Sequence, residues 1–120
     1  MYEALGGEPF FTDLVEGFYL GVEKDEILRP MYPEDLTDAK RHLILFLVQY
    51  WGGPRTYLEE RGHPRLRMRH APFTINKRAR EAWLSAMMHS LNELKARMTD
   101  EQFTEFAEYF AMSAMQLRNA

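Results

Sequence analysis

The sequence predicts an all-α protein, and two observations support this prediction. Four stretches of the 120-residue chain place apolar side chains three and four positions apart, which is the spacing of one face of an α-helix. No stretch long enough for a β-strand alternates apolar and polar residues, and the chain contains no internal repeat. Because this length is typical of one domain, we expect residues 1–120 to form a single domain.

The first predicted helix covers residues 9–22. Gly6 and Gly7 precede it, and Pro9 stands near its first position, where proline's missing amide hydrogen removes no helical hydrogen bond. The connection over residues 23–36 contains two prolines and several acidic residues, so we expect only a short turn of helix there.

The second predicted helix covers residues 37–51 and carries the longest apolar run of the chain, residues 43–48. Thr37 and Asp38 are candidate capping residues at its start, and a Gly-Gly-Pro run directly after it marks its end. Because the run 43–48 is apolar on every side, we expect this helix to be buried around most of its circumference. The run is far too short for a membrane span, so we expect no membrane association and a cytoplasmic protein.

The third and fourth predicted helices cover residues 76–98 and 100–118. Asn76 is a good cap for the third helix, which would be about six turns long. The fourth begins with Thr99-Asp100-Glu101-Gln102, the pattern of a capping box. Its apolar side chains form one stripe, as expected for a helix that packs on one side.

Residues 52–80 are basic, whereas the rest of the chain is acidic. This segment carries eight Lys and Arg against two Glu, and the other 91 residues carry seven basic and sixteen acidic side chains. A connection as long as residues 52–75 usually has a function. Arg65, Arg67 and Arg69 alternate with other residues, which favours an anionic ligand with an apolar body over a nucleic-acid backbone. A solvated surface remains the plain alternative.

The absence of cysteine excludes whole classes of site: disulfides, thiolate metal sites, iron–sulfur clusters and covalent haem attachment. Four histidines remain as nitrogen ligands, and no HExxH or HxxxH pair supports a zinc hydrolase. The chain also lacks a Gly-rich phosphate loop and a GxSxG nucleophile elbow. Its eight Phe, six Tyr, two Trp and eight Met suit the wall of a large apolar pocket.

His70, at the far end of the long connection, allows two interpretations. As an isolated loop residue it would contact solvent. As a ligand, its neutral imidazole would hold a haem iron, the aromatic-rich helices would form the pocket, and the basic segment would supply cations for two propionates. His42, His63 and His89 are weaker candidates. We expect His42 on the helix surface or at the boundary of the core, His63 in a turn, and His89 exposed.

Three strings of residues closely resemble the truncated haemoglobins of group II. They are Tyr50-Trp51-Gly52-Gly53-Pro54, the run 61–73 that contains His70, and Ala82-Trp83-Leu84. Matches at Gly6-Gly7, Phe18-Tyr19 and residues 31–35 extend the resemblance over nearly the whole chain. It implies a two-over-two helical sandwich around non-covalent haem b, in which helix 9–22 pairs with 37–51 and helix 76–98 pairs with 100–118. It also implies that His70 is the proximal ligand of the haem iron.

The resemblance further implies which residues contact the haem and its ligand. The distal side, where O₂, NO or CO would bind, maps onto Tyr19, Tyr32, Ala39, Leu43 and Trp83. Besides His70, the implied haem contacts are Leu43, Phe46, Leu47, Tyr57, Leu66, Arg67, Arg69, Phe73, Trp83 and Met87. Among these, Tyr57, Arg67 and Arg69 are the candidates for the propionates and the rim.

We therefore expect a haem protein that binds O₂ and other diatomic ligands. A hydrogen bond to a charged acceptor contributes roughly 1.5–3 kcal/mol, so each distal donor would slow O₂ release by roughly one to two powers of ten. Slow release fits scavenging, NO dioxygenation or peroxide turnover better than bulk oxygen transport, and such redox chemistry requires a reductase. The oligomeric state is open, a homodimer being one option.

The alternative is a cofactor-free helical module that binds nucleic acid or another anion through the arginine cluster of residues 55–80. Such binding would weaken steeply with salt, because it releases counterions. The purified protein would then be colourless, whereas a haem protein would absorb strongly in the visible range.

Overall fold

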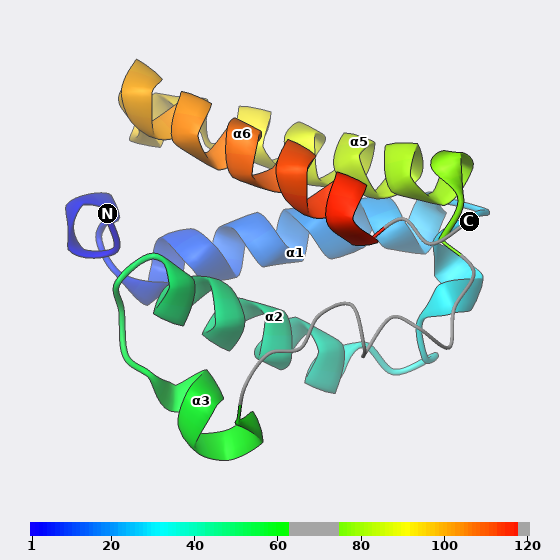
Figure 1. Cartoon of the computed structure of the whole chain (residues 1–120), viewed down its shortest axis with the longest axis horizontal. Coiled ribbons are helices and arrows are strands. Elements are labelled where there is room, and N and C mark those ends of the chain that lie inside the picture. Colours follow the sequence, from blue (N-terminus) through cyan, green and yellow to red (C-terminus); the bar gives the residue numbers. More distant parts are fainter. Residues whose placement is uncertain (63–74, 118–120) are drawn as a thin grey trace.

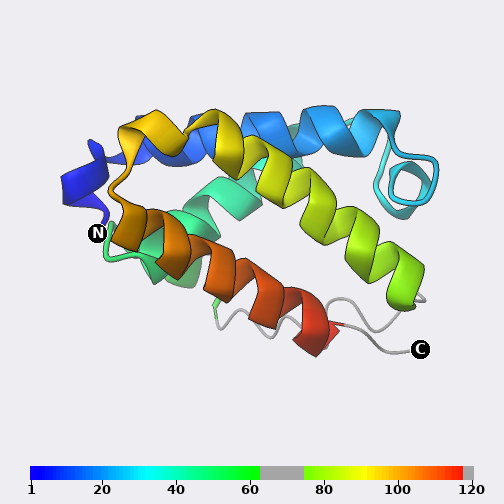
Figure 2. The same cartoon turned by 90° about the horizontal axis from the view of Figure 1, so that it is seen from above.

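Four long helices form the body of the protein, whose computed structural model describes residues 1–62 and 75–117. The elements in chain order are η1 (Glu3–Leu5), α1 (Glu8–Lys24), η2 (Arg29–Met31), α2 (Thr37–Tyr50), α3 (Thr56–Arg61), α5 (Lys77–Glu93), η3 (Lys95–Arg97) and α6 (Asp100–Leu117), η marking 3₁₀ turns. α1 packs against both α2 and α5, and α5 also packs against α6 (Figure 1). Figure 2 shows α5 and α6 side by side and antiparallel. The described residues contain no strand, so the all-α prediction is confirmed.

α1 is the central helix, and its sequence suits contact on two sides. Seven of its side chains are buried: Phe10, Phe11, Leu14, Val15, Phe18, Tyr19 and Val22. The helix begins one residue before and ends two residues after the predicted range 9–22. Pro9 lies in its first turn, as expected from the chemistry of proline.

Small residues bring α1 close to α5. A Cβ on Gly17 would overlap the Ser90 hydroxyl, and one on Gly21 would lie 3.0 Å from the Ala86 Cβ. The buried Ser90 Oγ donates a 2.6 Å hydrogen bond to the carbonyl oxygen of Leu14, which satisfies the hydroxyl away from water. The close approach of the two helices fixes how far the cavity-lining side chains of α5 lie from α1.

α2 begins at the predicted residue but is capped differently. The Asp35 carboxylate, and not Thr37 or Asp38, accepts a 3.0 Å hydrogen bond from the Thr37 amide. The expected burial of residues 43–48 is too extensive: the second half of the run is buried, but residues 43–45 are only half-buried. Among the described residues, α1 and α3 pack on α2 and cover only part of its surface. No helix in residues 1–62 or 75–117 is long and apolar enough to cross a membrane.

The long connection after α2 contains a short helix, α3, that the sequence did not predict. Six residues are too few to show helical periodicity, and tertiary contacts stabilise this element instead. The Gln49 side chain of α2 accepts a 2.9 Å hydrogen bond from the Leu58 amide. Tyr57 is buried, and its ring meets Phe46 edge to face with centroids 5.5 Å apart.

The two C-terminal helices begin as their sequences predict. The Asn76 side chain accepts a 2.9 Å hydrogen bond from the Ala79 amide, which caps α5. Thr99 and Gln102 form the expected capping box of α6, each side chain accepting from the other residue's amide at 3.1 and 2.9 Å. The predicted end of the third helix at residue 98 is wrong. α5 ends at Glu93, and the 3₁₀ turn η3 follows.

Candidate functional site

A cavity of about 190 Å³ lies between the two helix pairs and α3. Its lining residues come from α1 (Phe18, Tyr19), the segment after η2 (Tyr32), α2 (His42, Leu43, Phe46, Leu47), α3 (Tyr57, Arg61), α5 (Trp83, Met87) and α6 (Tyr109, Phe110, Ser113). Most of these side chains are aromatic or aliphatic, and the few polar groups lie at separate places in the wall. Such a pocket suits a flat apolar ligand that makes a small number of polar contacts.

Three polar hydrogens gather on one side of the cavity, on Tyr19, Tyr32 and Trp83, which we call the donor trio. The rings of Tyr19 and Tyr32 meet edge to face with centroids 5.5 Å apart, and the Trp83 indole N–H donates a hydrogen bond to the Tyr32 hydroxyl oxygen. Burial raises the pKa of Tyr19, and it raises the pKa of Tyr32 to about 12 although the Trp83 bond lowers it. Both phenols therefore keep their protons at neutral pH and can donate hydrogen bonds to an anionic acceptor.

Tyr32 lies in irregular backbone, and Arg29 holds that backbone in place. The Arg29 guanidinium donates hydrogen bonds to the carbonyl oxygens of Tyr32, Pro33 and Glu34 at 3.3, 3.0 and 2.9 Å. One planar guanidinium thus ties three consecutive peptide groups together. Tyr32 is positioned from outside the cavity by a residue that does not line it.

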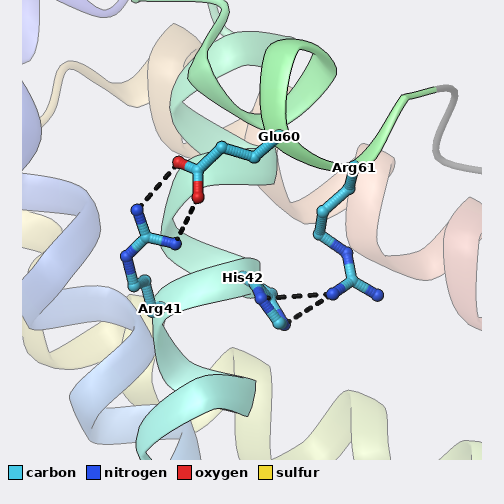
Figure 3. Close-up of polar contacts among 4 residues, drawn as sticks. All are labelled: Arg41, His42, Glu60 and Arg61. Atoms are coloured by element: carbon cyan, nitrogen blue, oxygen red, sulfur yellow. Dashed lines mark hydrogen bonds and ion pairs between the residues drawn. The ribbon is translucent and has the colours of Figure 1, made fainter.

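His42 and Arg61 add polar groups to the wall, and with Arg41 and Glu60 beside them they form a group that we call the charged edge: Arg41 and His42 of α2 with Glu60 and Arg61 of α3 (Figure 3). Arg41 donates to both carboxylate oxygens of Glu60 at 2.9 and 2.8 Å. One guanidinium nitrogen of Arg61 lies 3.2 Å from each ring nitrogen of His42. Burial and the nearby Arg61 charge lower the pKa of His42, which favours the neutral imidazole.

The structure brings most of the described candidate residues together. Eight of them line the one cavity: Tyr19, Tyr32, Leu43, Phe46, Leu47, Tyr57, Trp83 and Met87. Ala39 does not; it is half-buried on α2, one turn before Leu43. His70, Leu66, Arg67, Arg69 and Phe73 lie outside the described residues, as does His63. His89 is exposed, as expected.

Sequence reasoning missed several lining residues, and the reasons differ. Tyr109 and Ser113 lie three positions after Phe106 and Phe110, so helical spacing places them beside the apolar stripe of α6, a signal that the sequence contains. Arg61 reaches the cavity only because α3 folds back on α2, and no local pattern shows that. His42 was expected as a helix-surface or boundary residue, and it is half-buried accordingly, but the sequence did not show that it lines the cavity.

Comparisons with known proteins identify the family. Residues 1–116 match the family described as bacterial-like globin. Over 93 residues the chain is 45% identical to the group 2 truncated hemoglobin YjbI of Bacillus subtilis, an alignment that covers 78% of this chain and 70% of that protein. The chain belongs to the group II truncated haemoglobins.

Solved structures of similar proteins agree with this truncated haemoglobin in fold. A hemoglobin from the thermophilic bacterium Chloroflexus aurantiacus is 50% identical, with a TM-score of 0.94, and the match covers 99% of this chain and 97% of that chain. The group II truncated hemoglobin of Bacillus anthracis is 42% identical, with a TM-score of 0.90 and coverage of 99% and 95%. The two-over-two arrangement expected from the sequence is confirmed.

A truncated haemoglobin carries haem and binds diatomic ligands such as O₂, so the cofactor-free alternative is wrong. The cavity fits such a group in the chemistry of its wall. Flat aromatic and aliphatic side chains suit the porphyrin, phenol and indole donors suit a ligand that gains negative charge, and Arg61 suits a carboxylate at the rim. No three His, Asp or Glu side chains of the described residues gather into another metal site.

Proposed function

We propose that this truncated haemoglobin scavenges or detoxifies diatomic ligands and peroxide, and does not serve in bulk oxygen transport. The observation that carries the proposal is the donor trio, since the buried Tyr19 and the half-buried Tyr32 and Trp83 line the haem cavity in contact with one another. A carrier must release its ligand readily. Donors that slow release favour a protein that holds or consumes the ligand.

The proposal assigns His70 as the residue that holds the haem iron. When bound, the haem supplies an iron centre that takes diatomic ligands and exchanges electrons. In the described part of the chain, the side chains that would contact the porphyrin are Leu43, Phe46, Leu47, Tyr57, Trp83 and Met87. Leu66, Arg67, Arg69 and Phe73 complete the proposed contacts by resemblance.

The donor trio acts through its hydrogen atoms. O₂ that accepts electron density attracts donors, and each good hydrogen bond to such an acceptor contributes roughly 1.5–3 kcal/mol. At about 1.4 kcal/mol per factor of ten, each donor slows release roughly ten- to hundredfold. The raised pKa values of Tyr19 and Tyr32 support this role, because they keep both phenols protonated.

The proposed chemistry is NO dioxygenation or peroxide reduction. The distal position that the resemblance gives to Ala39 carries only a methyl group, so no imidazole at that position restricts the path of a ligand to the iron. The NO branch would need a reductase, because each NO dioxygenation would take one electron from the bound haem group. The peroxide branch would instead need a donor of two electrons for each H₂O₂.

The test is O₂ release from a variant that lacks all three donors, Tyr19→Phe, Tyr32→Phe and Trp83→Phe combined. Stopped-flow mixing of the oxygenated ferrous protein with a ligand trap measures the rate. We expect release at least about a hundred times faster than from the wild type, which is less than three independent donors would give because Trp83 and Tyr32 share a hydrogen bond. An unchanged rate in a variant that still binds haem would overturn the proposed role of the trio.

A further inference from the structure

Tyr109 separates the haem cavity from a groove on the protein surface. Its side chain lines the cavity and also lines the groove, which has a volume of about 570 Å³. We call this the acidic groove, because Glu105 and Glu108 of α6 line it together with Tyr50, Trp51 and Met112. Tyr109 is therefore in contact with both the haem cavity and the acidic groove.

Tyr109 is in ring contact with an exposed tyrosine. The ring centroids of Tyr109 and Tyr50 are 4.3 Å apart, with planes inclined at 36°. Tyr50 is 54% exposed at the end of α2. Electron tunnelling falls steeply with the distance between rings, so two phenols in contact provide a short route from the cavity wall to solvent.

We propose that Tyr109 and Tyr50 form a one-electron relay from the acidic groove to the haem cavity, and that the groove takes a phenolic electron donor. The relay rests on the peroxide branch of the proposed function, which supplies the oxidant. Electrons would travel inward, from the donor to Tyr50, then to Tyr109, then to the haem.

The reaction balances with H₂O₂ as oxidant and the phenol as reductant. One H₂O₂ takes up two electrons and two protons and becomes two molecules of water. Each electron leaves Tyr50 while its phenolic proton passes to water, so the residue becomes a neutral tyrosyl radical. A phenol in the groove then returns one electron and one proton to Tyr50 and is released as a phenoxyl radical. Two phenols are consumed for each H₂O₂.

The surroundings of the rings favour Tyr50 as the residue that keeps the radical. Oxidation of a phenol makes its proton strongly acidic, and the exposed Tyr50 hydroxyl can release that proton to water. Burial raises the pKa of Tyr109, whose hydroxyl hydrogen-bonds Ser113. The neighbouring Trp51 is a poor end point, since its indole N–H is buried and has no hydrogen-bond partner among the described residues.

The groove chemistry selects the class of donor. Glu105 and Glu108 are exposed carboxylates that attract cations and accept hydrogen bonds from a phenolic hydroxyl, and they repel anions. Met112, 59% exposed, and the Tyr50 ring give an aromatic donor an apolar surface. We therefore expect cationic and neutral phenols to react faster than anionic ones.

The test traps the radical in the ferric holoprotein after one equivalent of H₂O₂, with 2-methyl-2-nitrosopropane as spin trap. Trypsin separates the two tyrosines, because Tyr50 lies in fragment 42–55 and Tyr109 in fragment 98–118. Mass spectrometry of the fragments locates the label. The variants are Tyr50→Phe, Tyr109→Phe, Trp51→Phe and, as a control away from the cavity, Tyr2→Phe. An absorption spectrum of each variant checks that it carries haem.

We expect the wild-type label on Tyr50, its loss in Tyr109→Phe, and its transfer to Tyr109 in Tyr50→Phe. Tyr2→Phe and Trp51→Phe should keep the label on Tyr50. A label on Tyr50 that survives Tyr109→Phe would overturn the relay. If the wild type consumes peroxide without any label on Tyr50, the relay is wrong and the proposed function stands; if it consumes no peroxide, both the peroxide branch and the relay fail.

A second measurement tests the donor class independently. With H₂O₂ present, tyramine, a cationic phenol, should be oxidised faster than the anionic 4-hydroxyphenylacetate. The double variant Glu105→Gln/Glu108→Gln should lose this preference, and Tyr50→Phe should slow the oxidation of both donors. Equal rates for the two phenols in the wild type would contradict the assignment of the acidic groove as the donor site.

Discussion

The donor trio lines the haem cavity, whereas the charged edge reaches it only through His42 and Arg61, and the polar groups of the two regions are held in different surroundings. Tyr19 and Tyr32 lie where burial raises the pKa of each phenol, so their protons stay in place. Arg41 and Glu60 of the charged edge are exposed to water and lie on α2 and α3, two helices that follow one another in the sequence. Water screens the second pair, so its attraction contributes little.

This difference shows where a substitution will matter. A hydrogen bond inside an apolar cavity competes with no solvent, so removing a donor from the trio changes ligand binding directly. A charge at the solvent boundary is replaced by water at small cost. We therefore expect the two sides to respond unequally, and four substitutions test that expectation.

The substitution with the largest expected effect tests whether the cavity between the donor trio and the charged edge holds a haem through His70. His70→Ala should yield protein without the intense Soret absorption of a haem globin, because the iron loses its proposed protein ligand. Absorption spectra of the freshly purified proteins measure this. His89→Ala is the matched control, since the His89 side chain is exposed. Its Nε2 lies 3.5 Å from the Glu93 Oε1, which is also exposed on α5. Normal haem absorption by His70→Ala would contradict the assignment.

The next effect isolates one member of the donor trio. Trp83→Phe keeps an aromatic ring in the cavity and removes the indole N–H, so O₂ should dissociate about ten times faster. Stopped-flow measurement of O₂ release gives the rate. Trp51→Phe is the control, because Trp51 is a buried indole outside the cavity lining. An unchanged rate in Trp83→Phe would remove Trp83 from the ligand contacts.

A smaller effect tests the backbone that positions the trio. Arg29→Ala removes three hydrogen bonds to the carbonyl oxygens around Tyr32 and leaves every lining residue intact. We expect faster O₂ release than in the wild type, but slower than in Trp83→Phe. Arg97→Ala, which breaks an exposed ion pair with Asp13, is the control. Equal rates for Arg29→Ala and the wild type would show that Tyr32 needs no such support.

The smallest effect belongs to the charged edge. The pKa of His42 is lowered in the folded protein, so below about pH 6.5 the unfolded chain binds the proton more readily and folding loses stability. Thermal melts from about pH 7.5 to about pH 5.5 should therefore show a larger loss of stability in the wild type than in His42→Gln. His89→Gln should behave like the wild type, and an identical pH dependence in His42→Gln would contradict the lowered pKa.

Local chemistry explains the parts of the fold that the sequence predicted well. The capping residues Asn76, Thr99 and Gln102 contact amides within three positions along the chain, so their pattern is complete in the sequence. The burial of α1 follows likewise from its apolar spacing. The sequence also predicted eight residues that meet in one cavity, because the resemblance on which that prediction rests covers nearly the whole chain. Their roles toward haem stay predictions.

The sequence by itself determined the helical class, the helix starts and the family to which the chain belongs. Only the tertiary structure decided which distant side chains meet: α3 folding onto α2 brings Arg61 to His42, and α6 places Tyr109 between the haem cavity and Tyr50. The physical reason is the range of the interactions. Periodicity and capping act within a few residues, whereas the cavity and the acidic groove depend on helix contacts between segments far apart in the sequence.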